Sequence, residues 1–117
     1  MNKQHTDSCW FDHDPSSITV CDTEGTIVAM NKASRSNFKK YGGGDLIGKS
    51  LFACHPESAN EQIREMLKEQ ISHTYIIEVK GKKRLVHQAP WYDNARFAGL
   101  IETIMEFSGD IEVLKRD

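Results

Sequence analysis

Two adjacent residues of this 117-residue chain, Cys54 and His55, have side chains that could do chemistry together. They lie in the run FACHP at residues 52–56, and a thiol beside an imidazole could bind a metal or haem, or form a nucleophile pair. Neighbouring residues rarely point the imidazole at the sulfur, as thiolate activation requires, so a nucleophile pair is disfavoured. Ligation of haem or a metal stays open, beside a structural interpretation in which Cys54 is a small buried hydrophobe and Pro56 shapes the chain before a helix.

A second set, His5, Cys9 and His13, is spaced four residues apart. On a helix these residues would share one face and could hold zinc. Two aspartates crowd the segment and Pro15 ends it, which favours a solvated segment. We therefore predict no metal site here.

A third set lies in Leu85-Val-His-Gln-Ala-Pro-Trp91, which reads as a strand. Side chains alternate between the faces of a sheet, so only one of His87 and Gln88 can face a pocket, and the sequence leaves open which one. A pocket-facing His87 or Gln88 could hydrogen-bond a small polar ligand, and Thr103 on the next strand is expected beside it. Pro90 has no N–H to donate, which predicts a bulge or break near Trp91.

Enzyme motifs are missing from the sequence. It contains no nucleophile elbow, P-loop, HExxH or spaced carboxylate motif. We interpret the chain as a binding protein and not as an enzyme.

The composition indicates one soluble domain. Hydrophobic residues make up 38% and charged residues 27%, and 15 basic against 17 acidic residues give no footprint for nucleic acid or an anionic membrane. Three widely spaced cysteines without a CxxC fit reduced thiols, and there is no membrane-length apolar run or signal peptide. A cytoplasmic location is expected.

The elements that would position these side chains start with a hairpin. Residues 18–22 and 26–30 read as strands around a turn in which Gly25 takes a positive φ. Residues 32–41 predict short helical turns, and Gly42-Gly-Gly44 breaks the chain.

One long amphipathic helix is predicted from about Ser58 to Ile71. Ser58 and Glu61 form a capping-box signature at its start. One face collects the apolar residues Ala59, Ile63, Met66, Leu67 and Ile71.

Three strands follow, over residues 74–80, 84–92 and 97–107. Alternation in the last strand predicts one buried face, with Phe97, Ile101, Met105 and Phe107. Leu100 and Ile104 would then lie on the outer face, where Trp10 and Phe11 or a second subunit would cover them.

In this order the elements resemble the PAS (Per-Arnt-Sim) family. The matching pieces are Asp22-Thr-Glu-Gly25-Thr-Ile-Val28, Met30-Asn31-Lys32-Ala33, Phe38, Tyr41, Asp45-Leu-Ile-Gly48-Lys-Ser-Leu-Phe52, Gly99 and Gly109-Asp110-Ile111. The resemblance implies an α+β fold with a five-stranded antiparallel sheet of order 2-1-5-4-3, and short helices and one long helix around a small cavity on one face. It places an N-terminal cap segment at 1–15, the PAS domain at 16–111, and the start of a C-terminal linker or helix at 112–117.

The resemblance also implies a function: a signal-sensing and interaction module that binds a small ligand between helix and sheet. Implied pocket residues are Asn31, Phe38, Phe52, Cys54, His55, Ile63, Leu67, His87, Gln88, Ile101 and Thr103. The family's closing motif assigns Asp110 to signal output. We expect a homodimer through Trp10, Phe11, Leu100 and Ile104, which signals to a partner protein or an output domain outside this sequence.

The identity of a cofactor stays open. In flavin-binding relatives the reactive cysteine stands three residues after the glycine matching Gly48, and here that residue is Leu51, which argues against a flavin adduct. Haem-binding relatives usually supply a histidine from the long helix, and residues 59–71 contain none. The alternatives are a haem- or metal-based redox sensor using Cys54, His55 or the face formed by His5, Cys9 and His13, or a ligand-free dimerisation module.

Overall fold

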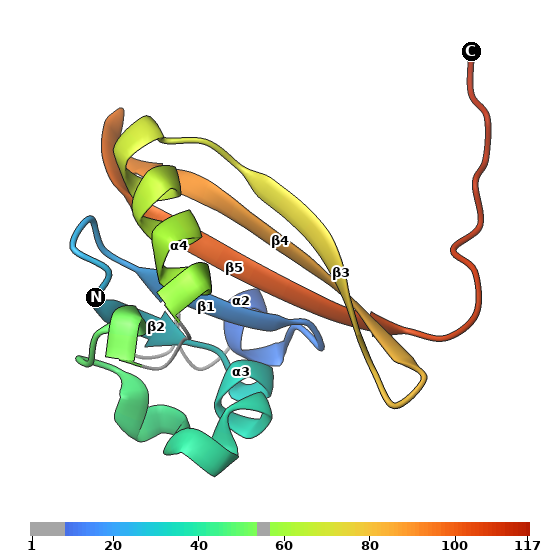
Figure 1. Cartoon of the computed structure of the whole chain (residues 1–117), viewed down its shortest axis with the longest axis horizontal. Coiled ribbons are helices and arrows are strands. Elements are labelled where there is room, and N and C mark those ends of the chain that lie inside the picture. Colours follow the sequence, from blue (N-terminus) through green and yellow to red (C-terminus); the bar gives the residue numbers. More distant parts are fainter. Residues whose placement is uncertain (1–8, 54–56) are drawn as a thin grey trace.

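The five strands form a single antiparallel sheet of order β2-β1-β5-β4-β3 in the computed structural model, which describes residues 9–53 and 57–117 (Figure 1). The strands are β1 (Ser17–Cys21), β2 (Ile27–Met30), β3 (His73–Val79), β4 (Lys82–Asp93) and β5 (Arg96–Phe107). The predicted strand order is confirmed.

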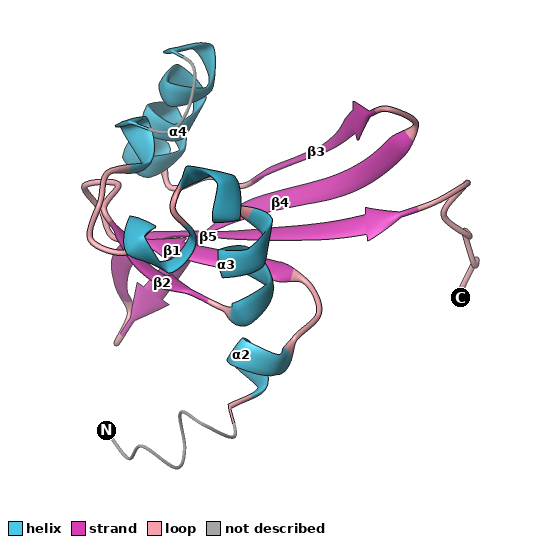
Figure 2. Cartoon of the chain, turned by 90° about the horizontal axis from the view of Figure 1, so that it is seen from below, coloured by secondary structure: helices cyan, strands magenta, loops and turns pink. Residues whose placement is uncertain are grey.

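The helices are short apart from one. They are α2 (Trp10–His13), α3 (Lys32–Asn37) and α4 (Glu57–Glu69), with 3₁₀ turns at Lys39–Tyr41, Gly43–Leu46 and Leu51–Ala53. Figure 2 shows α3 and α4 beside the sheet, while the C-terminal segment runs away from it. Residues 108–117 form neither helix nor strand, so Asp110 lies exposed in an irregular segment. No helix in the described part of the chain is long and apolar enough to cross a membrane.

Asp22 and Gly25 shape the first hairpin. The Asp22 carboxylate accepts hydrogen bonds from the backbone N–H groups of Glu24 and Thr26, both at 2.9 Å, and Gly25 has φ +84° as predicted. A β-carbon at Gly25 would also meet the Phe52 ring at 2.6 Å. The turn therefore needs glycine for two reasons.

The loop before α4 docks on this hairpin through backbone hydrogen bonds. Gly48 donates to Ile27, Ile27 donates to Lys49, and Leu51 donates to Gly25, at 2.7–2.9 Å. Gly48 has φ +95° at this docking point, a backbone conformation that favours glycine.

The core lies between the helices and the sheet. One cluster joins β1, α4 and β5 through Cys21, Ile63, Met66 and Leu100, and a second joins β2 to the 3₁₀ turns through Ile27, Met30 and Leu46. Burying such side chains contributes about 25 cal/mol for each Å² of apolar surface removed from water. Packing of α4 onto the sheet, more than its own helix propensity, therefore holds it in place.

Strand β4 has a bulge near its C-terminal end, as Pro90 predicts. The register between β4 and β5 shifts between Trp91 and Tyr92. The Trp91 indole then donates a hydrogen bond of 3.0 Å to the backbone oxygen of Cys21.

The side-chain alternation of β5 is opposite to the prediction. Leu100 is only 5% exposed and packs with Cys21, Ile63 and Met66 on the face that α4 covers. Ile104 shares that face, beside Phe38 and Val86. Leu100 and Ile104 are therefore not the outer-face partners of Trp10 and Phe11.

Alternation then turns Ile101 and Thr103 to the face away from α4. Their predicted place in the pocket is wrong for the same reason. Hydrophobic alternation favoured the face with more apolar residues, and in β5 that is the outer face.

Candidate functional site

Four polar side chains form a row across the helix-covered face of the sheet. The register places His73 opposite Gln88, Gln88 opposite Glu102, and Glu102 opposite Thr19, on four neighbouring strands. We call these four residues the polar row. A line of polar groups beneath the longest helix is unusual in a position that normally builds the core.

Gln88 is the centre of the polar row and is only 7% exposed. Its side-chain nitrogen donates to the Glu102 carboxylate at 2.8 Å and to the Tyr75 hydroxyl at 3.4 Å. A carboxylate only accepts hydrogen bonds, so the amide nitrogen must face Glu102. This pairing fixes the direction in which the amide oxygen points.

Two buried atoms of the polar row lack a hydrogen-bond partner within the described residues. They are the Gln88 side-chain oxygen Oε1 and the His73 ring nitrogen Nδ1. Leaving such an atom buried and unpaired costs about 1–3 kcal/mol. Native proteins rarely retain two such atoms side by side unless water or a ligand satisfies them.

Both atoms belong to residues that line one cleft. The cleft has a volume of about 270 Å³ and separates the start of α4 from β3 and β4. Its lining residues are Ser58, Ala59, Gln62, Ile63, His73, Tyr75 and Gln88. This volume lies slightly below the range of about 300–1,000 Å³ that is typical of small-molecule sites.

A smaller, mostly apolar cavity shares the lining residues Ile63 and Gln88 with the cleft. Its volume is about 20 Å³, which is room for one water-sized group. Thr19, Gln88 and Glu102 supply its polar wall, and its remaining lining residues are Cys21, Leu51, Ile63, Met66 and Leu100. Thr19 is already hydrogen-bonded to Ser34 at 2.6 Å between the two hydroxyl oxygens.

Burial and charge affect the ionisable groups around the polar row. Burial raises the pKa of the Tyr75 hydroxyl above 10.0, and the nearby Glu102 charge raises it further. Burial likewise raises the pKa of the Cys21 thiol above 9.0. Both groups are therefore neutral at physiological pH, and Cys21 serves as a core residue.

Glu102 has no ion pair with any basic side chain of the described residues. Arg84 lines a second cleft, of about 240 Å³, together with Glu102, but its guanidinium lies 3.3 Å from Asn37 Oδ1 and 3.6 Å from Glu106 Oε1. Within residues 9–53 and 57–117, the Glu102 carboxylate is therefore stabilised by the hydrogen bond from Gln88 and not by an ion pair.

Of the pocket residues predicted from sequence, Ile63 and Gln88 line both the cavity and the cleft. Leu67 and Phe52 pack against the core cluster beside them, and Phe38 lines the second cleft. The structure also answers the question left open between the two residues of β4. Gln88 faces the site, and His87 lies on the opposite face, where its ring nitrogen is 2.7 Å from the Thr74 hydroxyl.

Asn31 is not available to a ligand, although it is completely buried. Its side-chain oxygen accepts from the backbone N–H groups of Ile18 and Ser34, both at 2.9 Å. Its nitrogen donates to the backbone oxygens of Ser16 at 2.8 Å and Asp14 at 3.4 Å. The amide's capacity is used up, so the predicted pocket role of Asn31 is wrong, and the residue caps α3 instead.

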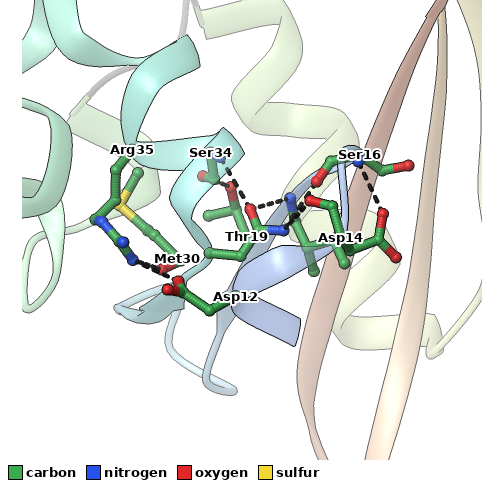
Figure 3. A network of polar contacts seen from close by, with 9 residues as sticks. Asp12, Asp14, Ser16, Thr19, Met30, Ser34 and Arg35 are labelled. Carbon is green, nitrogen blue, oxygen red and sulfur yellow. Dashed lines mark hydrogen bonds and ion pairs between the residues drawn. The ribbon is translucent and has the colours of Figure 1, made fainter. Parts of the chain in front are cut away.

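Figure 3 shows the network of polar contacts that links Asp12, Thr19, Ser34 and Arg35. Ser34 reaches Thr19, and the Arg35 guanidinium bridges the Met30 backbone oxygen at 2.8 Å and the Asp12 carboxylate at 3.1 Å. Arg35 therefore ties α2 to α3. Trp10 of α2 is 69% exposed and forms an edge-to-face pair with Phe11.

The predictions for Cys54, His55 and His5 lie outside the described residues. Cys9 has extended backbone angles before the four-residue α2, so it does not stand on one helix with His13. No three His, Cys, Asp or Glu residues among those described come together as a metal site.

Sequence reasoning missed Thr19, His73, Tyr75 and Glu102. Each looks like an ordinary strand residue on its own, and only the cross-strand register brings them together. The one signal in the sequence is Glu102 itself, a charge in the middle of an apolar strand. Pairing it with Gln88 required knowing how β4 and β5 are aligned.

Comparison with known proteins agrees with this fold. The PAS domain of a Colwellia psychrerythraea protein superposes with a TM-score of 0.64 at 20% identity, covering 92% of this chain and 98% of that one. The PAS domain of Bordetella pertussis BvgS gives a TM-score of 0.65 at 20% identity, covering 92% and 89%.

The structure of the Vibrio cholerae VqmA dimer gives a TM-score of 0.70 at 16% identity, covering 92% of this chain and 53% of that one. No curated protein matched the sequence. The family model for the PAS fold matches residues 11–91, which is more than half of the chain. The chain therefore belongs to the PAS fold family, whose members are generally sensory and signalling modules.

Proposed function

We propose that this PAS domain is a sensor that binds a small molecule in the cleft between α4 and strands β3 and β4, without catalysing a reaction. The observation that carries the proposal is the pair of buried, unpaired atoms, Gln88 Oε1 and His73 Nδ1, on residues that line one cleft. A ligand that hydrogen-bonds either atom would remove a desolvation penalty of about 1–3 kcal/mol.

The signal would arise from a shift between two packings of α4. The cleft is bounded by α4 on one side and by strands on the other, so a bound molecule contacts both. A ligand that prefers one helix position shifts the population toward it by its difference in affinity. The adjoining cavity at Ile63 would carry that shift into the core.

A variant that fills the cleft tests this proposal. Ala59 lines the cleft on α4, so Ala59→Phe should occupy the ligand's space. Glu61→Phe is the matched control, because Glu61 is exposed on the same helix. Native mass spectrometry of protein purified from its own cell extract should show an added small-molecule mass on the wild type and on Glu61→Phe, and little on Ala59→Phe.

Two outcomes would contradict the proposal. One is a wild-type protein that carries no added mass. The other is an added mass that Ala59→Phe retains in full, since the ligand would then bind somewhere else.

We also propose that the domain forms a homodimer through the sheet face turned away from α4. In support, Ile76, Leu85 and Met105 are direct cross-strand neighbours there, and Ile76 is 55% exposed. Such a row on a solvent-facing sheet is a common site of association. The VqmA structure, which shares the fold, is described as a dimer.

A further inference from the structure

Gln88 and Glu102 of the polar row present hydrogen-bond acceptors to a ligand. The Gln88 amide nitrogen is already committed to Glu102 and Tyr75, which leaves its oxygen as the unpaired atom. Glu102 is a carboxylate, which only accepts hydrogen bonds. Gln88 and Glu102 share the wall of the cavity of about 20 Å³. A group that enters this cavity must therefore donate hydrogen bonds.

The charged residues around the cavity and the cleft further restrict the class of ligand. No lysine or arginine of the described residues lines the cavity or the adjoining cleft, and no basic side chain pairs with Glu102. A ligand carboxylate or phosphate would meet the Glu102 charge at short range without a cation to offset it. The described part of the site therefore disfavours an anionic ligand and has no cation paired with Glu102.

Size and shape complete the description. The cavity accepts one water-sized group, which is also the size of a primary ammonium. The cleft that meets it at Ile63 and Gln88 has about 270 Å³ and partly apolar walls, including Ala59 and Ile63. A compact apolar body would lie in the cleft while its polar end occupies the cavity.

We infer that the ligand class of this site is a small primary amine, bound as the ammonium ion between Gln88 Oε1 and the Glu102 carboxylate with its apolar body in the cleft. This inference rests on the proposed function and specifies its ligand. Glu102 is the specificity-determining residue, because its charge is what separates an amine from an alcohol of the same shape. Hydrogen bonds to a charged group contribute about 1.5–3 kcal/mol, more than neutral ones do.

Three probes with the same body test the assignment: benzylamine, benzyl alcohol and benzoate, titrated calorimetrically into the complete chain. We expect benzylamine to bind at least about tenfold tighter than benzyl alcohol, and benzoate to bind weakest. In Glu102→Gln, which keeps the side-chain size, benzylamine affinity should fall about ten- to a hundredfold while that of benzyl alcohol stays nearly constant. Glu106→Gln is the matched control, because it removes the same charge from the same strand outside the site, and it should change neither affinity.

The outcomes separate this inference from the proposed function. If benzyl alcohol or benzoate binds as tightly as benzylamine, and Ala59→Phe abolishes that binding, the cleft is a ligand site and the amine assignment is wrong. If benzylamine does not bind at millimolar concentration, the amine assignment is also wrong, and the cavity holds a buried water only. If Ala59→Phe leaves all binding unchanged, the proposed cleft fails and the amine assignment fails with it.

Discussion

At the scale of single residues, the Gln88 amide decides what the site can recognise. Its nitrogen must point to Glu102 because two acceptors cannot pair, and so the oxygen is left unpaired. The neighbouring Tyr75 stays protonated because its environment is buried and negatively charged. The Gln88 amide nitrogen thus donates one hydrogen bond to the Glu102 carboxylate and a second to the Tyr75 hydroxyl.

Tyr75 makes this arrangement measurable. Its pKa is raised above 10.0 in the folded protein by burial first and by the Glu102 charge second, so the unfolded chain loses this proton at a lower pH. The contribution of Tyr75 to the free energy of unfolding is intact below about pH 10 and decreases as the pH rises through the folded pKa. Ultraviolet titration of the wild type minus Tyr75→Phe should give a midpoint above 10.0.

The same titration in Glu102→Gln should show a smaller upward shift, because one of the two causes is gone. A midpoint for Tyr75 at or below 10.0 in the wild type would contradict the buried position described for its hydroxyl.

At the scale of elements, strand β5, which lies in the middle of the sheet, carries the main error of sequence reasoning. Its outer face has Ile101 and Met105, while its inner face has Glu102 between Leu100 and Ile104. A count of apolar residues predicts that the outer face is the buried one, because the charged residue Glu102 occupies a central position on the inner face. Only the packing of Leu100 under α4 shows which face is buried.

Gly99 sets the distance between β5 and β1. It has φ +140°, and a β-carbon there would lie 1.9 Å from the backbone oxygen of Cys21. Gly99→Ala should lower the free energy of unfolding by about 2–4 kcal/mol, because both the backbone angle and the contact are unfavourable. Urea unfolding followed by circular dichroism measures the change.

Gly81→Ala is the control for the backbone angle alone. Gly81 has φ +79° at a hairpin tip with no atom near its missing β-carbon, so we expect a loss of about 1 kcal/mol. Equal losses in the two variants would mean that the close approach to Cys21 has no energetic weight.

At the scale of the whole molecule, the order of elements was enough to predict the sheet topology, because the family resemblance fixes it. The turn at Gly25 and the bulge after Pro90 were predictable too, since each follows from the backbone chemistry of one residue. The site was not, because its four polar residues come from strands whose register depends on tertiary packing. Of the predicted pocket, Gln88 and Ile63 line the site, while Asn31 serves the fold instead.

A measurement of the molecular mass in solution tests the proposed dimer. One chain is 13.3 kDa, and light scattering after size exclusion should give about twice that value. Ile76→Asp places a charge in the exposed apolar row and should shift the protein toward the monomer. Ile47→Asp is the matched control, because Ile47 is also exposed but lies in the loop before α4.

A wild-type protein that runs as a monomer at high concentration would overturn the dimer. Equal dissociation of the two variants would overturn its assignment to this sheet face.

The Asn31 amide has a consequence for how motion travels through the domain. One side chain bonds residues 14–16, the start of β1 and the first turn of α3. If any of these three segments opened, the buried Asn31 amide would lose hydrogen bonds, at a cost of about 1–3 kcal/mol for each unpaired group. The three segments should therefore unfold locally as one unit. A displacement of residues 14–16 would be transmitted to α3 through Asn31 and not through the sheet.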